Sequence, residues 1–275
     1  MERASDILRI ISARKAAGEP FALATVVRTV AATAAKAGAK AVILPDGTIS
    51  EGWIGGGCAR AAVLKAAKDA LADGQSRLVS VQPPDLLDQQ GHASGEGGVR
   101  FAKNMCPSQG TMDIFVEPVL PRSQIIICGS SPVAVAVADF AKRAGFSVTS
   151  CAPADEQAAF GEIDRRIEGY ALSVDEPGAR YIVISTQGRG DEAALLAALA
   201  VDAEYIAFVG SRKKAEALKS SLAGHGISEE RLARLKAPAG LDLGAITPEE
   251  IAISILAEIV AVQRRKDSRD KAVVA

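Results

Sequence analysis

Residues 124–134 read Gln-Ile-Ile-Ile-Cys-Gly-Ser-Ser-Pro-Val-Ala, an apolar run followed by a glycine, two serines and a proline. A continuous apolar run is typical of a strand that is buried on both faces of a parallel sheet. Pro132 suits the first turn of a helix, so the segment predicts a strand, a glycine turn and a helix. This order of elements opens the sheet of dinucleotide-binding folds.

The rest of the second half repeats this alternation of strand and helix. The predicted strands are residues 124–128, 146–150, 181–185 and 205–209, and the predicted helices are about 132–144, 191–200, 212–223 and 248–264. Alternating strands and helices predict an α/β, doubly wound parallel sheet with right-handed crossovers. The last helix has a clear start, because Thr247, Pro248 and Glu250 form a capping box. Its apolar residues cover more than one side, which predicts burial in the core or in a homodimer interface.

The first half of the chain predicts a mixed α/β domain. The expected elements are helices at 5–15 and 58–72, strands at 21–27 and 111–118, and a hairpin of 40–44 with 48–54. The polar residues 83–110 are expected to form a long loop of the kind that is usually functional or disordered. Pro118 and Pro121 bracket a linker near residue 120. We therefore expect an N-terminal domain at 1–120 and a C-terminal domain at 121–275.

The composition argues against several classes of partner and location. The formal net charge is -1, whereas nucleic-acid binding usually requires a basic stripe. We expect no transmembrane helix, because no run of 18 apolar residues is present, and no secretory signal, because the N-terminus is charged throughout. The four cysteines form no CxxC pair and only two histidines are present. We therefore expect no zinc site and a reducing, cytoplasmic location.

The first candidate site is the turn Gly55-Gly56-Gly57-Cys58 between a predicted strand and a predicted helix. Glycines allow positive φ and a close approach of the backbone to a ligand. The N-terminus of the helix suits an anion, and a thiol placed there gains ligand or nucleophilic character. The residues alone leave two interpretations equally open. One is a cofactor site with Cys58 as a metal ligand, and the other is a tight turn around a small buried cysteine.

The second candidate cofactor-binding turn consists of Gly129, Ser130 and Ser131. It matches the first glycine of the G-x-G-x-x-G/A dinucleotide fingerprint, but Ser131 replaces the second one. The side chain of Ser131 takes space that a pyrophosphate needs. The next strand also lacks an acidic residue at its end, and we expect Asp155 and Glu156 to lie too far along the chain. Ordinary NAD(P) binding is therefore disfavoured.

The third candidate is Gly210-Ser211-Arg212, where Arg212 could hold a phosphate bidentately. These residues follow a strand of the predicted parallel sheet, at the edge where ligands bind. A fourth candidate is the loop 104–110, in which Cys106 is either exposed and reactive or tucked under the next strand.

Several of these motifs resemble the XdhC/CoxI/CoxF family over nearly the whole chain. In the first half the resemblance rests on Ala24-Thr-Val-Val27, Gly38-Ala-Lys40 and Ile54-Gly-Gly-Gly-Cys58. In the second half, which resembles the Rossmann-like C-terminal domain of the family, it rests on residues 205–214, 238–244 and 247–259. The resemblance implies an accessory factor for xanthine dehydrogenase, carbon monoxide dehydrogenase or a related molybdenum enzyme, rather than an enzyme with its own turnover.

The resemblance also implies a cofactor and partners. Such factors are thought to bind molybdenum cofactor (molybdopterin) transiently, guard it during sulfuration and pass it to the client apoenzyme. The implied partners are the client molybdenum hydroxylase and a cysteine desulfurase or sulfurtransferase. The turns 55–58 and 210–212 suit the pterin phosphate of such a ligand. Residues 104–121 resemble the branch associated with carbon monoxide dehydrogenase.

The chain departs from the family pattern at two places in its second half. It has Gly129-Ser-Ser-Pro132 where relatives have Gly-Ala-Gly-His, and Thr186-Gln187 where they have Thr-His. The missing histidines put metal or acid–base chemistry in the second domain in doubt. Two other functions therefore stay open, a nicotinamide-dependent oxidoreductase at Gly129 and a scaffold that binds only the client apoenzyme.

Overall fold

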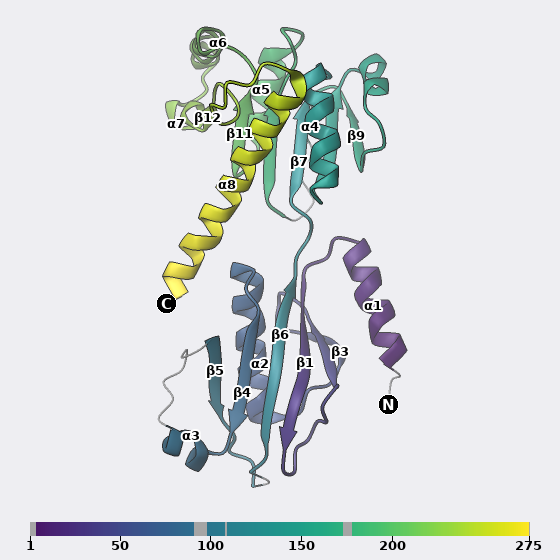
Figure 1. The fold of residues 1–275 in the computed structure, drawn as a ribbon, viewed down its shortest axis with the longest axis vertical. Coiled ribbons are helices and arrows are strands. Elements are labelled where there is room, and N and C mark those ends of the chain that lie inside the picture. Colours follow the sequence, from purple (N-terminus) through teal and green to yellow (C-terminus); the bar gives the residue numbers. More distant parts are fainter. Residues whose placement is uncertain (1–3, 91–97, 108, 173–177, 275) are drawn as a thin grey trace. The chain divides into compact units, whose positions relative to one another are not determined.

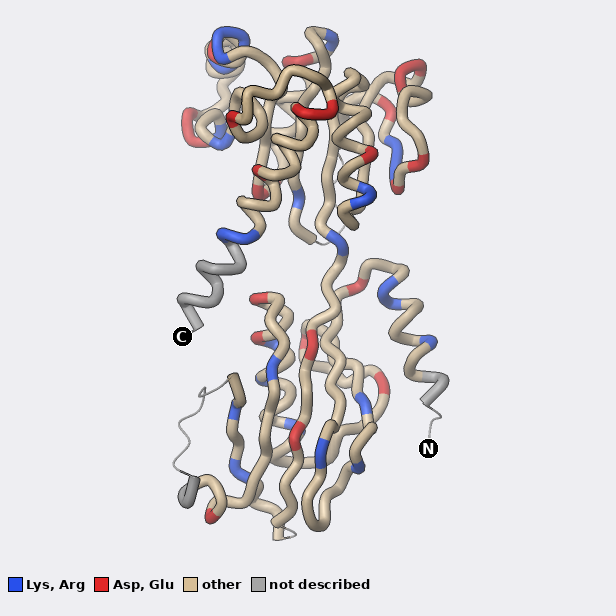
Figure 2. The backbone as a smooth tube through the Cα atoms, viewed as in Figure 1, with Lys and Arg blue, Asp and Glu red and all other residues tan. Residues whose placement is uncertain are grey.

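The computed structural model describes residues 4–90, 98–107, 109–172 and 178–274. The chain divides into two compact units, Met1–Pro121 and Arg122–Ala275 (Figure 1). Basic residues (Lys and Arg) and acidic residues (Asp and Glu) are interspersed along the backbone of both units (Figure 2). Among the described residues, no helix has the length and apolar character needed to cross a membrane.

The first unit is a six-stranded sheet with helices packed on it. Its elements are α1 (Ala4–Ala16), β1 (Phe21–Val30), β2 (Lys40–Ile43), β3 (Ile49–Gly52), α2 (Gly57–Asp73), β4 (Arg77–Gln82), α3 (Pro84–Gln90), β5 (Val99–Lys103) and β6 (Thr111–Val119). The strand order is β3-β2-β1-β6-β4-β5, and each neighbouring pair is antiparallel except the parallel pair β4 and β5. The hairpin of β2 and β3 was predicted from the sequence and is confirmed.

Alternation along β1 divides this unit into layers. Ala22, Ala24 and Val26 pack in the core that the alanine-rich face of α2 completes. Phe21 and Leu23 point to the other face and pack with Ile7 and Ile11 of α1. Small residues on α2 let the helix lie close to the sheet, which fits a core with few aromatic side chains.

The interpretation of residues 83–110 as one long loop is wrong. Residues 84–90 form α3, and residues 99–103 form β5, which pairs with β4. The strand β4 was also not predicted from the sequence. This strand carries Arg77, Ser80 and Gln82 between its apolar positions, so it lacks the continuous apolar run that marks the strands of the second half. Residues 91–97, in the middle of the predicted loop, lie outside the described residues.

The second unit is an all-parallel sheet covered by helices on both faces. Its elements are β7 (Gln124–Cys128), α4 (Pro132–Arg143), β8 (Ser147–Ala152), the 3₁₀ helix η2 (Ala154–Ala159), β9 (Arg165–Glu168), β10 (Arg180–Ile184), α5 (Asp191–Ala200), β11 (Tyr205–Phe208), α6 (Arg212–Gly224), α7 (Glu229–Ala233), β12 (Leu235–Lys236) and α8 (Pro248–Val274). The strand order is β12-β11-β10-β7-β8-β9. Counted from β7 and read from the β9 edge, this is the 3-2-1-4-5-6 order of dinucleotide-binding folds.

The helices divide between the two faces of this sheet. α4 and α8 share one core cluster, and α5, α6 and α7 contribute to the other. The predicted α/β class is therefore confirmed. The predicted capping box of α8 is present, since Thr247 Oγ1 accepts the Glu250 N–H at 3.2 Å and Glu250 accepts the Thr247 N–H at 3.0 Å. The burial of α8 is one-sided, because Ile255 and Ile259 are fully buried while Ile253 is 53% exposed.

Candidate cofactor site

One pocket of the first unit brings two of the four cysteines together. It has a volume of about 410 Å³, and both Cys58 and Cys106 line it. We call it the thiol pocket and define it by its lining residues, which are Thr33, Ala34, Gly55, Gly56, Gly57, Cys58, Ala59, Val81, Asn104, Met105, Cys106, Gly110 and Met112. In the sequence these cysteines were separate candidates, and the fold places them in one cavity.

Glycines form the wall of the thiol pocket that carries Cys58. Gly55 and Gly57 have φ values of 108° and 44°, a region that residues with a side chain rarely adopt. Gly56 has an ordinary φ of -103°, and a Cβ placed on Gly56 or Gly57 would meet nothing within 4 Å. The backbone of this wall is therefore uncovered, as a site for a closely held ligand requires.

The loop that carries Cys106 forms another part of the pocket wall. Asn104 orders this loop, because its side-chain amide donates to the Gly110 carbonyl at 2.6 Å and its Oδ1 accepts the Cys106 N–H at 3.0 Å. A Cβ placed on Gly110 would lie 2.2 Å from the carbonyl oxygen of Ala32. Only glycine allows this close approach, so the wall is held by backbone contacts on one side and by Asn104 on the other.

The first turn of α2 has no side-chain cap. Gly56 occupies the N-cap position and makes no capping hydrogen bond, whereas Ser131 caps α4 and Ser211 caps α6. N–H groups in the first turn of a helix have no partner inside the helix. Together with the helix dipole they favour an anion. Because residues 57–59 line the thiol pocket, the pocket has the positive end of a helix in its wall.

The second candidate turn, Gly129-Ser130-Ser131, is closed by its own side chains, and we call it the serine turn. Ser131 Oγ accepts the Ala134 N–H at 3.1 Å and lies 2.6 Å from Ser185 Oγ in a shared hydrogen bond. A Cβ placed on Gly129 would lie 2.5 Å from the carbonyl oxygen of Ser185. The end of β10 thus packs directly on the turn, at the switch point between β7 and β10 where a dinucleotide binds in such folds.

The expectation that Glu156 lies too far along the chain is wrong. η2 brings it back to the sheet edge, where the Ser130 hydroxyl donates to its carboxylate. Arg189 pairs with the same carboxylate at 3.3 Å. An acidic group is therefore present beside the serine turn, although it comes from the helix after β8 rather than from the end of the strand.

A buried acid that was not predicted from the sequence stabilises this sheet edge. Asp191 begins α5, accepts from the Thr186 hydroxyl and the Gly188 N–H, and pairs with Lys214 Nζ at 2.5 Å. Burial alone raises the pKa of Asp191, but the hydrogen bonds from Lys214, Thr186 and Gly188 outweigh it and hold that pKa below its usual value. The carboxylate is charged at neutral pH and joins α5, α6 and the end of β10. The signal available in the sequence was an acid in the first turn of a helix.

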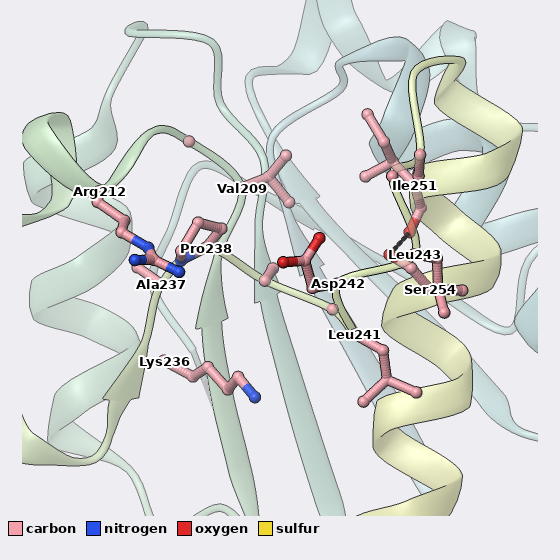
Figure 3. Close-up of a pocket in the computed structure, with 15 residues that line it drawn as sticks. Val209, Arg212, Lys236, Ala237, Pro238, Leu241, Asp242, Leu243, Ile251 and Ser254 are labelled. Atoms are coloured by element: carbon pink, nitrogen blue, oxygen red, sulfur yellow. Dashed lines mark hydrogen bonds between the residues drawn. The ribbon is translucent and has the colours of Figure 1, made fainter.

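The third candidate turn borders a larger pocket of the second unit, which we call the loop pocket. Its volume is about 690 Å³, and it is lined by Val209, Gly210, Arg212, Lys236, residues 237–245, Ile251 and Ser254. Figure 3 shows Arg212 and Asp242 reaching toward Pro238 from α6 and from the loop. Ser211 is not among the lining residues, because its hydroxyl caps α6 by accepting the Lys214 N–H at 3.2 Å. Of the three predicted residues, Gly210 and Arg212 therefore border a cavity.

A buried carboxylate fixes the wall of the loop pocket. Glu258 of α8 is 2% exposed and accepts from Tyr205 Oη at 2.7 Å, from the Gly240 N–H at 3.0 Å and from Lys236 Nζ. Burial raises the pKa of Tyr205 to about 12, so its hydroxyl stays a donor. A Cβ placed on Gly240 would lie 2.3 Å from Ser254 Oγ. These contacts explain why the motifs at 238–244 and 247–259 belong together.

Two family descriptions match the chain over the regions just described. "XdhC Rossmann domain" matches residues 125–259, and "XdhC and CoxI family" matches residues 15–82. The chain belongs to the XdhC and CoxI family. The XdhC resemblance predicted from the motifs is confirmed. The Gly55–Cys58 turn lies in the matched region 15–82, and the serine turn and the loop pocket lie in the matched region 125–259. Cys106 lies between the two matched regions.

Curated XdhC-like relatives are longer than this chain. It is 28% identical over 253 residues to the uncharacterized protein YqeB of Escherichia coli (strain K12), covering 89% of this chain and 44% of that protein. It is 28% identical over 163 residues to a probable xanthine dehydrogenase subunit of Bacillus subtilis (strain 168), covering 56% of this chain and 47% of that protein. The chain thus spans about half the length of the curated relatives it matches.

A solved structure also resembles the chain. It is described as the crystal structure of a xanthine dehydrogenase from Bacillus halodurans, with a TM-score of 0.45 and 19% sequence identity. The match covers 94% of this chain and 96% of that chain.

Proposed function

We propose that this protein is an accessory factor that binds molybdenum cofactor in the thiol pocket and assists its maturation and insertion into a molybdenum hydroxylase. The observation that carries the proposal is the convergence of an uncapped helix N-terminus and two cysteines on one pocket of an XdhC-type chain. The proposed client is a hydroxylase of the xanthine dehydrogenase or carbon monoxide dehydrogenase type. A cysteine desulfurase or sulfurtransferase is a further proposed partner.

The residues of the thiol pocket fit the chemistry of this cofactor. Its pterin carries a phosphate, which the first turn of α2 can bind through free N–H groups and the helix dipole. The uncovered backbone at Gly56 and Gly57 allows a close approach. The thiols of Cys58 and Cys106 are soft donors that suit the metal end of such a ligand. The bound group supplies molybdenum to the client, and the protein residues bind it, orient it and limit its contact with water.

Three observations at the serine turn favour this function over a nicotinamide-dependent oxidoreductase. The Ser131 side chain already occupies the helix N-terminus where a dinucleotide phosphate binds, and the Ser131–Ser185 hydrogen bond fills the switch point. In addition, the carboxylate of Glu156 is engaged by Ser130 and Arg189 rather than free to bind a ribose. A pyrophosphate at this turn requires all of these contacts to rearrange.

The test is the molybdenum and pterin content of the full chain after co-expression with the enzymes of cofactor synthesis and anaerobic purification. The wild-type chain is compared with Cys58→Ala and with Arg212→Ala. Arg212 borders the loop pocket in the other unit, so its variant controls for a phosphate site there. Circular dichroism of each variant verifies that the fold is intact.

We expect near-stoichiometric cofactor in the wild-type chain and in Arg212→Ala, and a several-fold loss in Cys58→Ala. A loss in Arg212→Ala with full retention in Cys58→Ala contradicts the assignment and moves the site to the loop pocket. If no folded form retains cofactor, the cofactor-binding function itself is contradicted, and a scaffold that binds only the client apoenzyme becomes the better explanation.

A further inference from the structure

The thiol pocket contains more sulfur donors than the two thiols that the proposed binding of molybdenum cofactor uses. Cys58 comes from the first turn of α2 and Cys106 from the loop before β6. Met105 and Met112 line the same cavity. Two thiols and two thioethers from three separate segments therefore face one space of about 410 Å³.

Imidazole and carboxylate donors are missing from the part of the pocket lining that the structure describes, which includes no His, Asp or Glu. The described part of the chain also holds no group of three or more His, Cys, Asp and Glu placed for a metal. Zinc in structural sites takes four N, S or O ligands in a tetrahedron, so two thiols do not complete a zinc site. Soft thiolate and thioether ligands favour monovalent copper, zinc and iron–sulfur clusters. Iron–sulfur clusters are typically held by four cysteines, so monovalent copper is the metal that two thiols suit.

The exposure of the two thiols suits capture of a metal from solution. Cys106 is exposed and Cys58 is half-buried, whereas Cys128 and Cys151 of the second unit are buried. The side chain of Asn104 accepts a hydrogen bond from the Cys106 N–H and donates one to the Gly110 carbonyl. The loop that carries Cys106 is therefore ordered by its own hydrogen bonds.

We propose that Cys58 and Cys106 form a two-thiol site that binds one thiophilic monovalent metal ion, with Met105 and Met112 as supplementary thioether ligands. Binding is Cu⁺ + 2 RSH → [Cu(SR)₂]⁻ + 2 H⁺, so two S–H bonds break, two Cu–S bonds form and no electron is transferred. Affinity rises with pH, because the ligands must lose their protons. The site goes beyond cofactor binding, since it requires no pterin.

The test uses Cu(I) alone, under anaerobic conditions, with the full chain free of pterin and a chromophoric Cu(I) chelator as competitor. The variants are Cys58→Ser, Cys106→Ser and the double variant, which keeps Cys128 and Cys151 as internal control thiols. We expect one Cu(I) per wild-type chain and a loss of affinity of at least about a hundredfold in each single variant, because loss of even a second-shell partner costs about 10–100-fold. A reagent that fluoresces only after alkylating two neighbouring thiols measures their proximity independently.

If Cys106→Ser binds Cu(I) with the affinity of the wild-type chain, the two cysteines do not bind the ion together. Retention of Cu(I) by the double variant contradicts the proposed site in the same way. Failure of the wild-type chain to compete with the chelator overturns the metal site. The pterin content described above is measured separately, so a chain that binds Cu(I) but no pterin contradicts only the proposed function, and the reverse result contradicts only the two-thiol site.

Discussion

The helices α2 and α4 each begin at a glycine turn that follows a strand, and the two turns differ in what satisfies the first N–H groups of the helix. At the Gly55–Cys58 turn the N-cap is a glycine without a capping bond, and the first turn of α2 borders a pocket. At the serine turn Ser131 caps α4 and is hydrogen-bonded to Ser185. The turn that resembles a dinucleotide site is thus closed, and the turn outside the dinucleotide-type fold is open. Fold topology alone favours the closed turn, whereas the cofactor site that we propose lies at the open one.

Cys58 lies in the first turn and Cys128 directly precedes the serine turn, and the reactivity of these two thiols gives the largest expected difference. Cys58 is half-buried and borders the thiol pocket, whereas Cys128 is fully buried at the end of β7. A hydrogen bond with Cys151, together with burial, raises the pKa of Cys128 well above its usual value. We expect native alkylation of Cys58 and Cys106 to be at least about a thousandfold faster than that of Cys128 and Cys151, because opening the core costs several kcal/mol.

Mass spectrometry of tryptic peptides after timed alkylation measures the four rates. Labelling in urea is the control, since all four thiols should then react at similar rates. Equal native rates for Cys58 and Cys128 contradict the contrast between an open and a closed turn.

Alanine at one glycine of each turn tests the same contrast through stability. At Gly129 the φ is 98° and a Cβ would lie 2.5 Å from the Ser185 carbonyl oxygen. We therefore expect Gly129→Ala to lower the free energy of unfolding by about 3 kcal/mol or more. At Gly56 the φ is ordinary and the space is open. Gly56→Ala should therefore lower the free energy of unfolding by less than about 1 kcal/mol, which is the difference in stability between glycine and alanine at an N-cap.

Urea unfolding can be followed for each unit separately. Trp53 is the only tryptophan of the chain and lies in the first unit, whereas all three tyrosines lie in the second. The shift in Gly129→Ala should appear in the tyrosine signal. Comparable losses for the two variants would mean that the turns are equally constrained.

The sequence predicted the elements of the second unit better than their contacts. β7 and α5 have the predicted bounds, because continuous apolar runs and clear helix starts are local signals. Glu156, Asp191 and Glu258 were missed as site residues because their roles depend on partners 26, 5 and 53 residues away in the chain. The meeting of Cys58 and Cys106 was also hidden, since it requires the pairing of β6 with β1 and β4, and β4 has no continuous apolar run.

Ser131 of the serine turn can be compared with Ser211, because each serine caps the N-terminus of a helix. Ser131 is 5% exposed and also bonds Ser185, whereas Ser211 caps α6 at the surface. We expect the free energy of unfolding to fall by about 2 kcal/mol in Ser131→Ala and by about 1 kcal/mol in Ser211→Ala, since an N-cap side chain contributes about 0.5–2 kcal/mol to stability. Tyrosine-detected urea unfolding measures both. Equal losses would mean that the Ser131–Ser185 bond adds nothing to the cap.

The smallest expected effect concerns the negative charge of Asp191, which stabilises the end of β10 beside the serine turn. Asp191 has a pKa below its usual value in the folded chain, so the folded state binds a proton less readily than the unfolded state does. Its contribution is present above the usual pKa of 3.8 and is lost as pH falls through the lower, folded value. At neutral pH, Asp191→Asn should lower the free energy of unfolding by about 1 kcal/mol, which is the net contribution of a typical hydrogen bond to stability.

The sign of the pH dependence separates a charged contact from a packing effect. The stability difference between wild type and Asp191→Asn should be constant from neutral pH down to the usual aspartate range and should shrink below it. Lys214→Met is the matched variant, because it removes the cation that pairs with Asp191 and keeps most of the side-chain volume. If the difference grows on acidification, the carboxylate is not held in its charged form, and the end of β10 is positioned by the Ser131–Ser185 hydrogen bond rather than by Asp191.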